Sequence, residues 1–232
     1  MMGSRRLNVV SYLGSQPLFK DMSAPELARI AAASTVRRLS RGEELFHAGQ
    51  SCEGLYLVID GMIKLYAKAP SGHEKVIEVI GAGGCVSESL MFSEGAHSVN
   101  ASVLFDVQLL VVPKDVLVHE IEHNAGLAMR MLTGLSRRMN GLVKDIEAVT
   151  LHSGVKRVVD YLLHSPVVGE AHNTEQDVTV SLPASKGTIA SLLSVTPEHF
   201  SRILHDLQAN GLISVERRHI HILDAQRLAS YA

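Results

Sequence analysis

The sequence predicts an α+β chain in which a barrel or sandwich of short strands precedes one long helix, two short helices and a hairpin. Closely spaced apolar runs over residues 43–112 are typical of strands in a sandwich or barrel. From Asn124 the apolar residues instead recur at alternating spacings of three and four, which predicts a helix. Two shorter amphipathic segments lie within residues 184–210.

The composition is that of an ordinary globular protein. Apolar residues make up 46% and charged residues 20% of the chain, which argues against disorder. No apolar run approaches the roughly 20 residues that a membrane helix needs, and residues 1–7 lack the core of a signal peptide. Cys52 and Cys85 lack the spacing of a disulfide framework or a thiolate metal cluster. We therefore expect a cytoplasmic protein without a membrane partner.

Turn-forming residues divide the N-terminal half into elements. Residues 17–36 predict a short helix with Ser23 as its N-cap. Apolar runs on both sides of Asp60-Gly61 predict a tight hairpin. Pro70-Ser71-Gly72 predicts a further turn that leads into a strand over residues 75–80.

The long helix carries a narrow apolar stripe. A helix that packs on its own domain usually shows a broader apolar face, so the stripe favours pairing with a second copy of the chain. Packing on the chain's own core is the alternative. The pattern stops at the hinge-like His152-Ser153-Gly154, so we expect segments 1–123, 124–152 and 153–232. The residues expected to pair are Leu132, Leu135, Met139, Leu142, Ile146 and Val149.

The last segment predicts two helices, over residues 186–193 and 197–207, joined by a break at Ser194-Val195-Thr196. Thr196 suits the N-cap of the second helix, where Pro197 takes the first position. Strand-like runs then flank Glu216-Arg217-Arg218 and predict a hairpin, or wing. A polar loop is expected over residues 165–177, before a strand over residues 178–182.

The second of these helices presents side chains that suit the edges of DNA bases. Arg202 can donate two hydrogen bonds to guanine, Glu198 can accept one from cytosine, and Ser201 can meet a thymine methyl group. The alternative is an ordinary solvated face, because Glu–Arg pairs four residues apart are common on helices. The residues expected to contact DNA are Glu198, Ser201, Arg202, Thr196, His199, Lys186, Arg217 and Arg218.

The overall charge does not favour a nucleic-acid partner. The net charge is −2, and from Gly154 onward we count seven Lys and Arg against eight Asp and Glu. DNA binding therefore requires the cations to gather on one face.

A rival hypothesis is a zinc enzyme. His119-Glu120-Ile121-Glu122-His123 matches the HExxH pattern, in which two histidines bind zinc and the first glutamate acts as a base. Met129 stands where one class of such enzymes has a third histidine, and Glu122 puts a charge where these helices are usually apolar. We expect coincidence rather than an enzyme. A third possibility is a ligand-binding regulatory module that does not contact DNA.

The order of a strand domain, a long helix and a winged helix-turn-helix resembles the CRP/FNR superfamily of bacterial transcription regulators over essentially the whole chain. Glu198-His199-Phe200-Ser201-Arg202 matches the Glu-x-x-Ser-Arg motif of the FNR branch. The resemblance implies a cyclic-nucleotide-binding-like β-barrel (jelly roll), a dimerisation helix and a winged helix-turn-helix. It also implies a homodimer on a palindromic double-stranded site of the TTGAT-N4-ATCAA type, with RNA polymerase as a further partner.

The resemblance also indicates where an effector would bind. Relatives that bind cyclic nucleotides hold ribose and phosphate with a Gly-Glu pair and an Arg-Ser/Thr pair. Here Ser87 precedes Glu88, and Ser98-Val99 takes the second position, so an anionic phosphate lacks its cationic partner and cyclic AMP is not expected. The residues expected to line the effector pocket are Glu88, Leu90, Met91, His97 and Ser98.

Two cofactors of the family are judged from the same resemblance. Oxygen-sensing relatives hold an iron–sulfur cluster on N-terminal cysteines, and no cysteine precedes Cys52, so no such cluster is expected. The stretches Leu135–Met139 and Asp145–Leu151 resemble the denitrification (DNR/NNR) group, which implies haem-dependent sensing of nitric oxide. His97 is a candidate axial ligand, but Gln16-Pro17 stands where some haem-binding members have histidines. An unidentified apolar or aromatic effector is the alternative.

Overall fold

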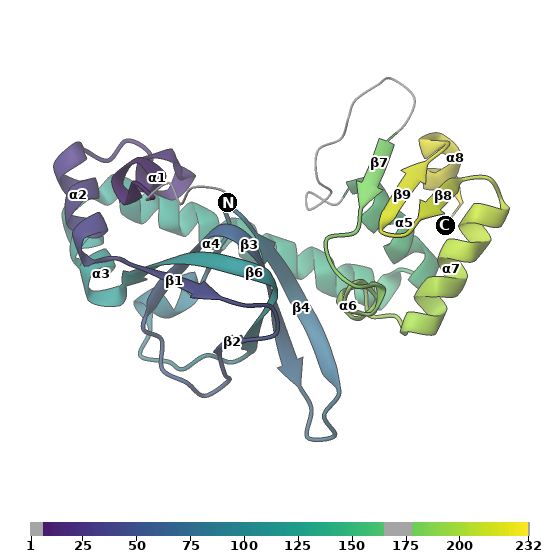
Figure 1. Cartoon of the computed structure of the whole chain (residues 1–232), viewed down its shortest axis with the longest axis horizontal. Helices are drawn as coiled ribbons and strands as arrows, with labels where there is room; N and C mark the ends of the chain where they lie inside the picture. The colour runs from purple at the N-terminus through teal and green to yellow at the C-terminus, as the bar shows by residue number, and fades with distance from the viewer. Residues whose placement is uncertain (1–6, 165–177, 232) are drawn as a thin grey trace, which may run out of the picture. The chain divides into compact units, whose positions relative to one another are not determined.

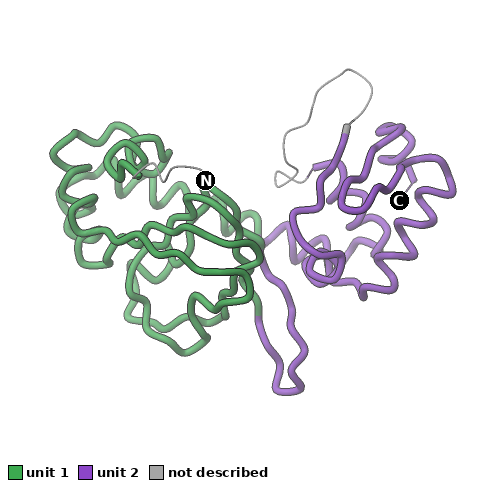
Figure 2. Tube along the Cα trace, in the orientation of Figure 1, with its two compact units in different colours: residues 1–66, 79–141 green, residues 67–78, 142–232 purple. Residues whose placement is uncertain are grey.

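The structure, a computed structural model, describes residues 7–164 and 178–231. The chain divides into two compact units (Figures 1 and 2). Unit 1 comprises residues 1–66 and 79–141, and unit 2 comprises residues 67–78 and 142–232. The loop expected over residues 165–177 lies outside the described residues.

Unit 1 begins with helix α1 (Val9–Ser15), the short 3-10 helix η1 (Pro17–Phe19) and helix α2 (Ala24–Ala33). The N-cap expected at Ser23 is confirmed, but the helix is shorter than the expected residues 17–36, because residues 17–19 form η1 and residues 35–36 belong to a strand. The physical reason is the capping box before Ala24: the Glu26 carboxylate accepts hydrogen bonds from the Ser23 backbone N–H and hydroxyl, both at 2.6 Å. These bonds hold the pKa of Glu26 down at about 2.

Strands β1 to β6 form a six-stranded, jelly-roll-like sheet with the path β1-β6-β3-β4, in which β2 pairs with β6 and β5 with β3. Among the described strands this path does not close into a barrel. The expected α+β architecture with an N-terminal jelly-roll-like sheet is confirmed. The strands are β1 (Thr35–Leu39), β2 (Glu44–Phe46), β3 (Gly54–Lys68), β4 (Glu74–Gly81), β5 (Cys85–Val86) and β6 (Asn100–Pro113).

The hairpin expected at Asp60-Gly61 was wrong, because β3 runs through it without turning. Both halves of β3 pair with β6, and the register shifts between Val58 and Ile63. Gly61 has a φ of +85°, and a Cβ there would lie 2.1 Å from the Asp106 carbonyl oxygen. The glycine therefore serves a bulge against β6 rather than a turn. The turn after Pro70 does connect β3 to β4, as expected.

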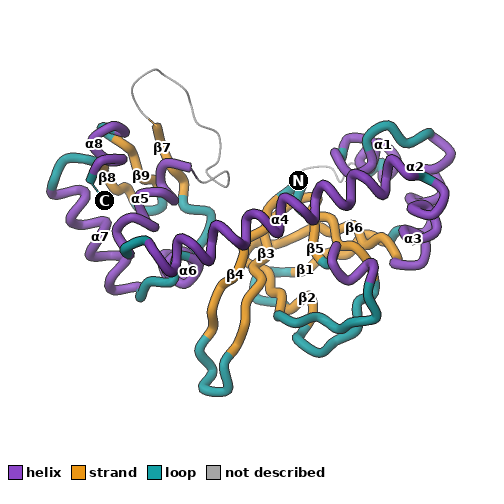
Figure 3. Tube along the Cα trace, turned by 180° about the vertical axis from the view of Figure 1, so that it is seen from behind, coloured by secondary structure: helices purple, strands orange, loops and turns teal. Residues whose placement is uncertain are grey.

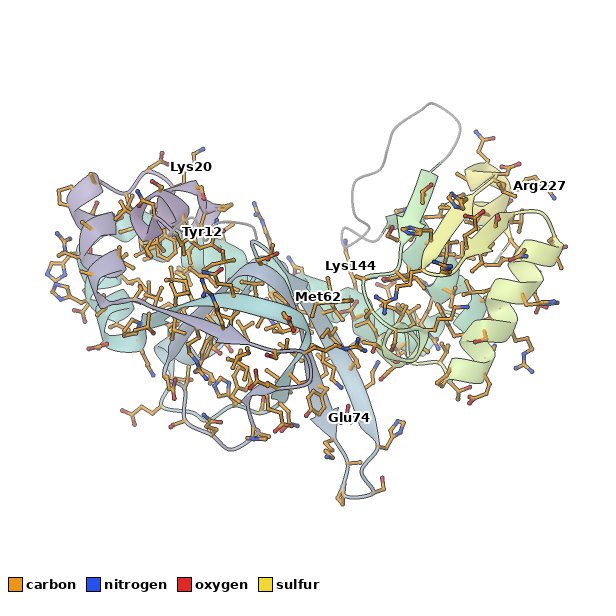
Figure 4. All side chains as sticks on the ribbon, viewed as in Figure 1. Tyr12, Lys20, Met62, Glu74, Lys144 and Arg227 are labelled. Atoms are coloured by element: carbon orange, nitrogen blue, oxygen red, sulfur yellow. The ribbon has the colours of Figure 1, made fainter. Side chains whose placement is uncertain are left out.

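Two apolar clusters cover the two faces of this sheet, as the two-residue period of a strand requires. Leu55 and Leu57 belong to the cluster beneath the helices, whereas Tyr56 and Val58 belong to the cluster inside the curved sheet. A hydrogen bond also joins α1 to the sheet, because the Tyr12 hydroxyl donates to the Val58 carbonyl of β3 at 3.1 Å (Tyr12 is labelled in Figure 4).

The helix α3 (Lys114–His123) follows β6 and leads into the long helix α4 (Ala125–Leu151) (Figure 3). Asn124 separates them, and its side-chain oxygen accepts from the Leu127 N–H at 2.9 Å, as an N-cap does. Leu127 and Met131 of α4 are buried in the cluster beneath the helices. The described helices include none that is long and apolar enough to span a bilayer.

Unit 2 contains a three-stranded antiparallel sheet with the order β7-β9-β8, packed with helices. In chain order its elements are α5 (Gly154–His164), β7 (Val178–Ser181), α6 (Lys186–Leu192), α7 (Pro197–Ala209), β8 (Ile213–Glu216), β9 (His219–Ile222) and α8 (Ala225–Ser230). The expected pair of short helices followed by a hairpin wing is present.

Substitution of Gly61 tests whether β3 carries a bulge at this position. We expect Gly61→Ala to lower the free energy of unfolding by about 2–4 kcal/mol, because a left-handed φ disfavours alanine and its Cβ would overlap the β6 backbone. Gly72 is the matched control: it has a φ of +86° but nothing within 4 Å of a Cβ, so Gly72→Ala should cost only about 1 kcal/mol. Urea denaturation measures both, and equal losses would contradict the bulge.

Candidate nucleic-acid interface

Helices α6 and α7 form a helix-turn-helix whose turn is fixed by backbone geometry (Figure 1). Ser194 adopts a left-handed φ of +56°, and the Val195 N–H donates to the Ala190 carbonyl at 3.0 Å. The Thr196 hydroxyl accepts from the His199 N–H at 3.2 Å, so Thr196 caps α7 as expected. Backbone groups at both helix ends of the turn therefore take part in hydrogen bonds.

The two faces of α7 differ sharply in burial. Its apolar face is buried and consists of Phe200, Ile203, Leu204 and Leu207. The opposite face is exposed, and we call it the α7 ridge: Glu198, Ser201, Arg202 and His205. Within the described residues, the side chains of Glu198, Ser201 and Arg202 have no hydrogen-bond or ion-pair partner. Their polar groups are therefore available to a ligand.

The other residues of α6 and α7 that are expected to contact DNA differ in their exposure. Lys186 is exposed at the first position of α6. Thr196 is exposed, although its hydroxyl serves as the cap. His199 is separated from the ridge: it is half-buried beside α5, where a Cβ on Gly154 would lie 3.0 Å from its Cε1. Gly154 therefore permits close packing of α5 and α7, whatever its part in a hinge.

The wing places two arginines at its tip. Arg217, with a φ of +56°, and Arg218 are exposed residues of the turn between β8 and β9. The carbonyl of Arg218 accepts from the Leu182 N–H at 2.8 Å, which ties the tip to the chain after β7. Behind the tip, the Ser181 hydroxyl lies 2.7 Å from Nδ1 of His219 across the sheet.

Two cations that the sequence did not single out brace the turn. Arg157 of α5 donates from Nε to the Leu193 carbonyl at 2.8 Å and from Nη2 to the Ser194 carbonyl at 3.1 Å. Lys75 donates from Nζ to the Leu192 carbonyl at 3.0 Å, and burial together with Arg157 lowers its pKa. Cations at the last carbonyls of a helix offset its negative end. Nothing in the sequence pattern distinguishes these residues from ordinary surface cations.

The apolar stripe on α4 is exposed in the single chain. Leu132, Met139 and Ile146 are 54%, 62% and 68% exposed. Leu142 and Val149 are exposed as well, whereas Leu135 is half-buried. A row of large apolar side chains in water is unusual on a monomer and is typical of an interface.

The expected effector residues fall into several settings within unit 1. Glu88 accepts two hydrogen bonds from Nη1 of Arg138 on α4, both at 3.1 Å, and one from Sγ of Cys85 at 3.1 Å. Ser87 has a φ of +76° and a buried hydroxyl without a partner among the described residues. The pairing of Glu88 with α4 has no sequence signal, because the two residues lie 50 positions apart.

Met91 and His97 are buried in different places. Met91 packs in the cluster beneath the helices, whereas the His97 ring stacks on Phe46 with ring centroids 3.5 Å apart. Burial lowers the pKa of His97, so its imidazole is neutral near pH 7. Leu90 is half-buried and Ser98 is exposed. A pocket of about 340 Å³ is lined instead by Arg29, Ala33, Asp115, Val116, His119 and Glu120.

The geometry of HExxH does not fit a zinc enzyme. Glu120, the base in that hypothesis, is only 1% exposed and receives Nε and Nη2 of Arg29 at 2.6 and 2.9 Å. His119 and His123 are exposed instead. The carboxylate is therefore held by a bidentate ion pair rather than aimed at a metal-bound water.

Comparisons with known proteins agree with this architecture. Residues 36–124 match the description "Cyclic nucleotide-binding domain", and residues 156–231 match "Crp-like helix-turn-helix domain". The chain is 24% identical to the "CRP-like cAMP-activated global transcriptional regulator" of Mycobacterium tuberculosis, over 93% of this chain and 96% of that protein.

Two solved structures extend the likeness over most of the chain. DNR from Pseudomonas aeruginosa is 31% identical, with a TM-score of 0.51 over 97% of this chain and 99% of that one. FixK2 from Bradyrhizobium japonicum is 19% identical, with a TM-score of 0.74 over 85% of this chain and 96% of that one, and shows the fold alone.

The relatives are transcription regulators and not enzymes, which confirms the expectation that the chain is not an enzyme. Regulators of this family bind DNA through the helix-turn-helix and act as dimers. With both domain matches and a 31% identical relative along its whole length, the chain belongs to the CRP/FNR family of DNA-binding transcription regulators.

Proposed function

We propose that this regulator reads a two-fold symmetric DNA site with the α7 ridge, under the control of an effector that is not a cyclic nucleotide. The observation that carries the DNA proposal is the exposed Glu198-Ser201-Arg202 surface, whose polar groups have no partner among the described residues. Polar groups held ready on a rigid helix recognise bases without first breaking internal contacts.

Each ridge residue has a distinct chemical part. The Arg202 guanidinium donates two hydrogen bonds to O6 and N7 of guanine. Glu198 accepts from the amino group of cytosine, and Ser201 meets a thymine methyl group or a base edge. Lys186, Arg217 and Arg218 contact phosphates, which position the helix without reading sequence. This set supports the proposed TTGAT-N4-ATCAA palindrome.

A palindrome requires a two-fold protein, and the α4 stripe supplies the surface for one. Two copies joined along this stripe place two reading helices on half-sites one turn of DNA apart. Exposed Met139, Leu142 and Ile146 would then be removed from water. RNA polymerase is the further partner that a regulator of this family contacts.

The proposal of a non-nucleotide effector rests on charge. In relatives that bind cyclic nucleotides, the residue at Glu88 holds ribose, but here its carboxylate is already paired with Arg138. No Lys or Arg lies between Glu94 and Val112 to receive a phosphate. An effector that displaces Arg138 from Glu88 would release a contact of α4 and so reach the dimer stripe.

Haem-bound nitric oxide is the more specific effector hypothesis. His97 does not fit an axial ligand in this structure, because its Nε2 is enclosed and its ring lies against Phe46. We therefore derive no step through haem, and a small apolar or aromatic effector is the alternative. Absorption spectra of protein incubated with haem, with and without nitric oxide, test the hypothesis. A Soret band that persists unchanged in His97→Ala would place the ligand elsewhere, and no band at all would exclude haem.

The first DNA prediction concerns Arg202. Arg202→Ala should weaken binding to the palindrome by about 1–3 kcal/mol and relax selectivity at one base pair of each half-site. Arg227→Ala is the matched control, because Arg227 is exposed on α8 outside the ridge (Figure 4). Fluorescence anisotropy on a set of single-base operator variants measures both. An equal loss on every duplex would mark Arg202 as a phosphate contact.

The second prediction concerns the brace. Arg157→Met keeps the aliphatic stem but removes the donors to the turn, so it should destabilise unit 2 by about 1.5–3 kcal/mol and weaken binding to all DNA sequences alike. Lys156→Met is the control, because Lys156 is half-buried on the same helix and pairs with Asp160 at 2.9 Å but donates nothing to the turn, and an ion pair that solvent reaches is worth about 1 kcal/mol or less. Thermal unfolding that responds equally to both variants would contradict the brace.

The third prediction concerns the dimer. Ile146→Glu should produce monomers, because two carboxylates would have to be buried against each other along the stripe. Thr133→Glu adds the same charge to an exposed position of α4 outside the stripe and should leave the dimer intact. Analytical ultracentrifugation separates the outcomes. A dimeric Ile146→Glu protein would mean that the copies associate through another surface.

A further inference from the structure

A cluster of side chains on α3 has no part in the proposed function. His119, Glu122 and His123 are exposed, and their ligand atoms lie within 4.8 Å of one another. We infer that these three residues bind one Zn²⁺ ion per chain, at a regulatory or structural site rather than a catalytic one. The ligand is expected to be a divalent transition-metal ion of borderline softness, because two imidazoles and one carboxylate suit zinc better than calcium or magnesium.

The spacing of the three residues places them on one face of α3. Positions i, i+3 and i+4 lie side by side on a helix. Two ligand atoms of a tetrahedral zinc site are about 3.3 Å apart, given zinc–nitrogen bonds of about 2.0 Å. Since all three side chains are exposed, ordinary rotations can close the remaining gap.

The His123 ring is already set in the form that binds metals. Its Nδ1 lies 2.7 Å from the His119 carbonyl oxygen, and a carbonyl can only accept a hydrogen bond. Nδ1 therefore carries the proton, which leaves Nε2 of the neutral ring with a free lone pair. In most metal-binding histidines, the ring nitrogen that does not bind the metal donates a hydrogen bond of this kind, which orients the ring. The two rings are adjacent, with centroids 4.4 Å apart.

The position of the cluster in the helix favours a cation. His123 is the last residue of α3, and the C-terminal end of a helix carries a partial negative charge. Asp115 is exposed one turn before His119 and adds a further negative charge on the same side. The nearby Arg29 guanidinium is occupied by Glu120.

The two glutamates of the motif exchange the roles that the sequence suggests. Glu120, expected as a base, is buried in its ion pair with Arg29 and cannot serve a metal-bound water. Glu122, whose charge argued against zinc, is the residue that joins the two histidines. Three protein ligands leave one position for water, without a base beside it.

The test uses the full-length protein without a purification tag, freed of metal by a chelator. Isothermal titration with ZnCl₂ at pH 7.5 should show one site per chain. The double variant H119A/H123A should abolish that site, and Glu122→Gln should weaken it by at least about tenfold, as loss of even an outer-shell partner does. Co²⁺ should give the visible absorption of a tetrahedral complex, and Zn²⁺ should raise the Tm of the wild type but not that of H119A/H123A.

The matched control is His164→Ala. His164 is an exposed histidine in the last turn of α5 and makes the same contact to the carbonyl four residues earlier, with its Nδ1 3.2 Å from the Asp160 oxygen. This variant should bind Zn²⁺ as the wild type does. The inference fails if the wild type shows no site at several-fold excess Zn²⁺, or if H119A/H123A keeps it.

Discussion

The long helix α4 must satisfy two sets of contacts at once, and this constraint organises the protein. One face binds the chain's own first unit through buried Leu127 and Met131 and through the ion pair of Arg138 with Glu88. A different face carries apolar side chains that are exposed among residues 7–164 and 178–231. Anything that alters the first set of contacts alters the helix that carries the second. A change near Glu88 thus acts, through Arg138, on the helix that carries the proposed dimer surface.

The second organising feature is that cationic side chains donate hydrogen bonds to the backbone carbonyls at the turn between α6 and α7. A turn between two helices exposes carbonyl groups that a helix would normally satisfy, and each needs a partner when it is buried. Arg157 and Lys75 provide those partners from elements distant in sequence. The charges near α7 therefore divide into two groups: some stabilise the fold, and the exposed ones are those proposed to contact DNA. Net charge alone, at −2, cannot separate these groups.

Most of the fold could be predicted from local patterns, because helix caps and apolar periods act within a few residues. The starts of α4 and α7 followed from Asn124, Thr196 and Pro197. The predictions that proved wrong depended on contacts between residues distant in the sequence. Asp60-Gly61 has the local chemistry of a turn, but β6 keeps both flanking runs in one strand. Likewise, the HExxH segment has the residue types of a zinc enzyme, yet Arg29, which lies 91 positions away, forms an ion pair with Glu120. Single-sequence patterns do not contain such partners.

The start of α7 has a consequence for how recognition proceeds. A proline at the first turn and a hydroxyl cap at Thr196 restrict the backbone before any partner arrives. The proposed complex then needs little ordering of the main chain of α7, and the loss of freedom falls mainly on the side chains that contact DNA. Such a preorganised element tends to discriminate through shape and bond geometry rather than through coupled folding, so a wrong base pair meets a surface that does not readily adapt to it.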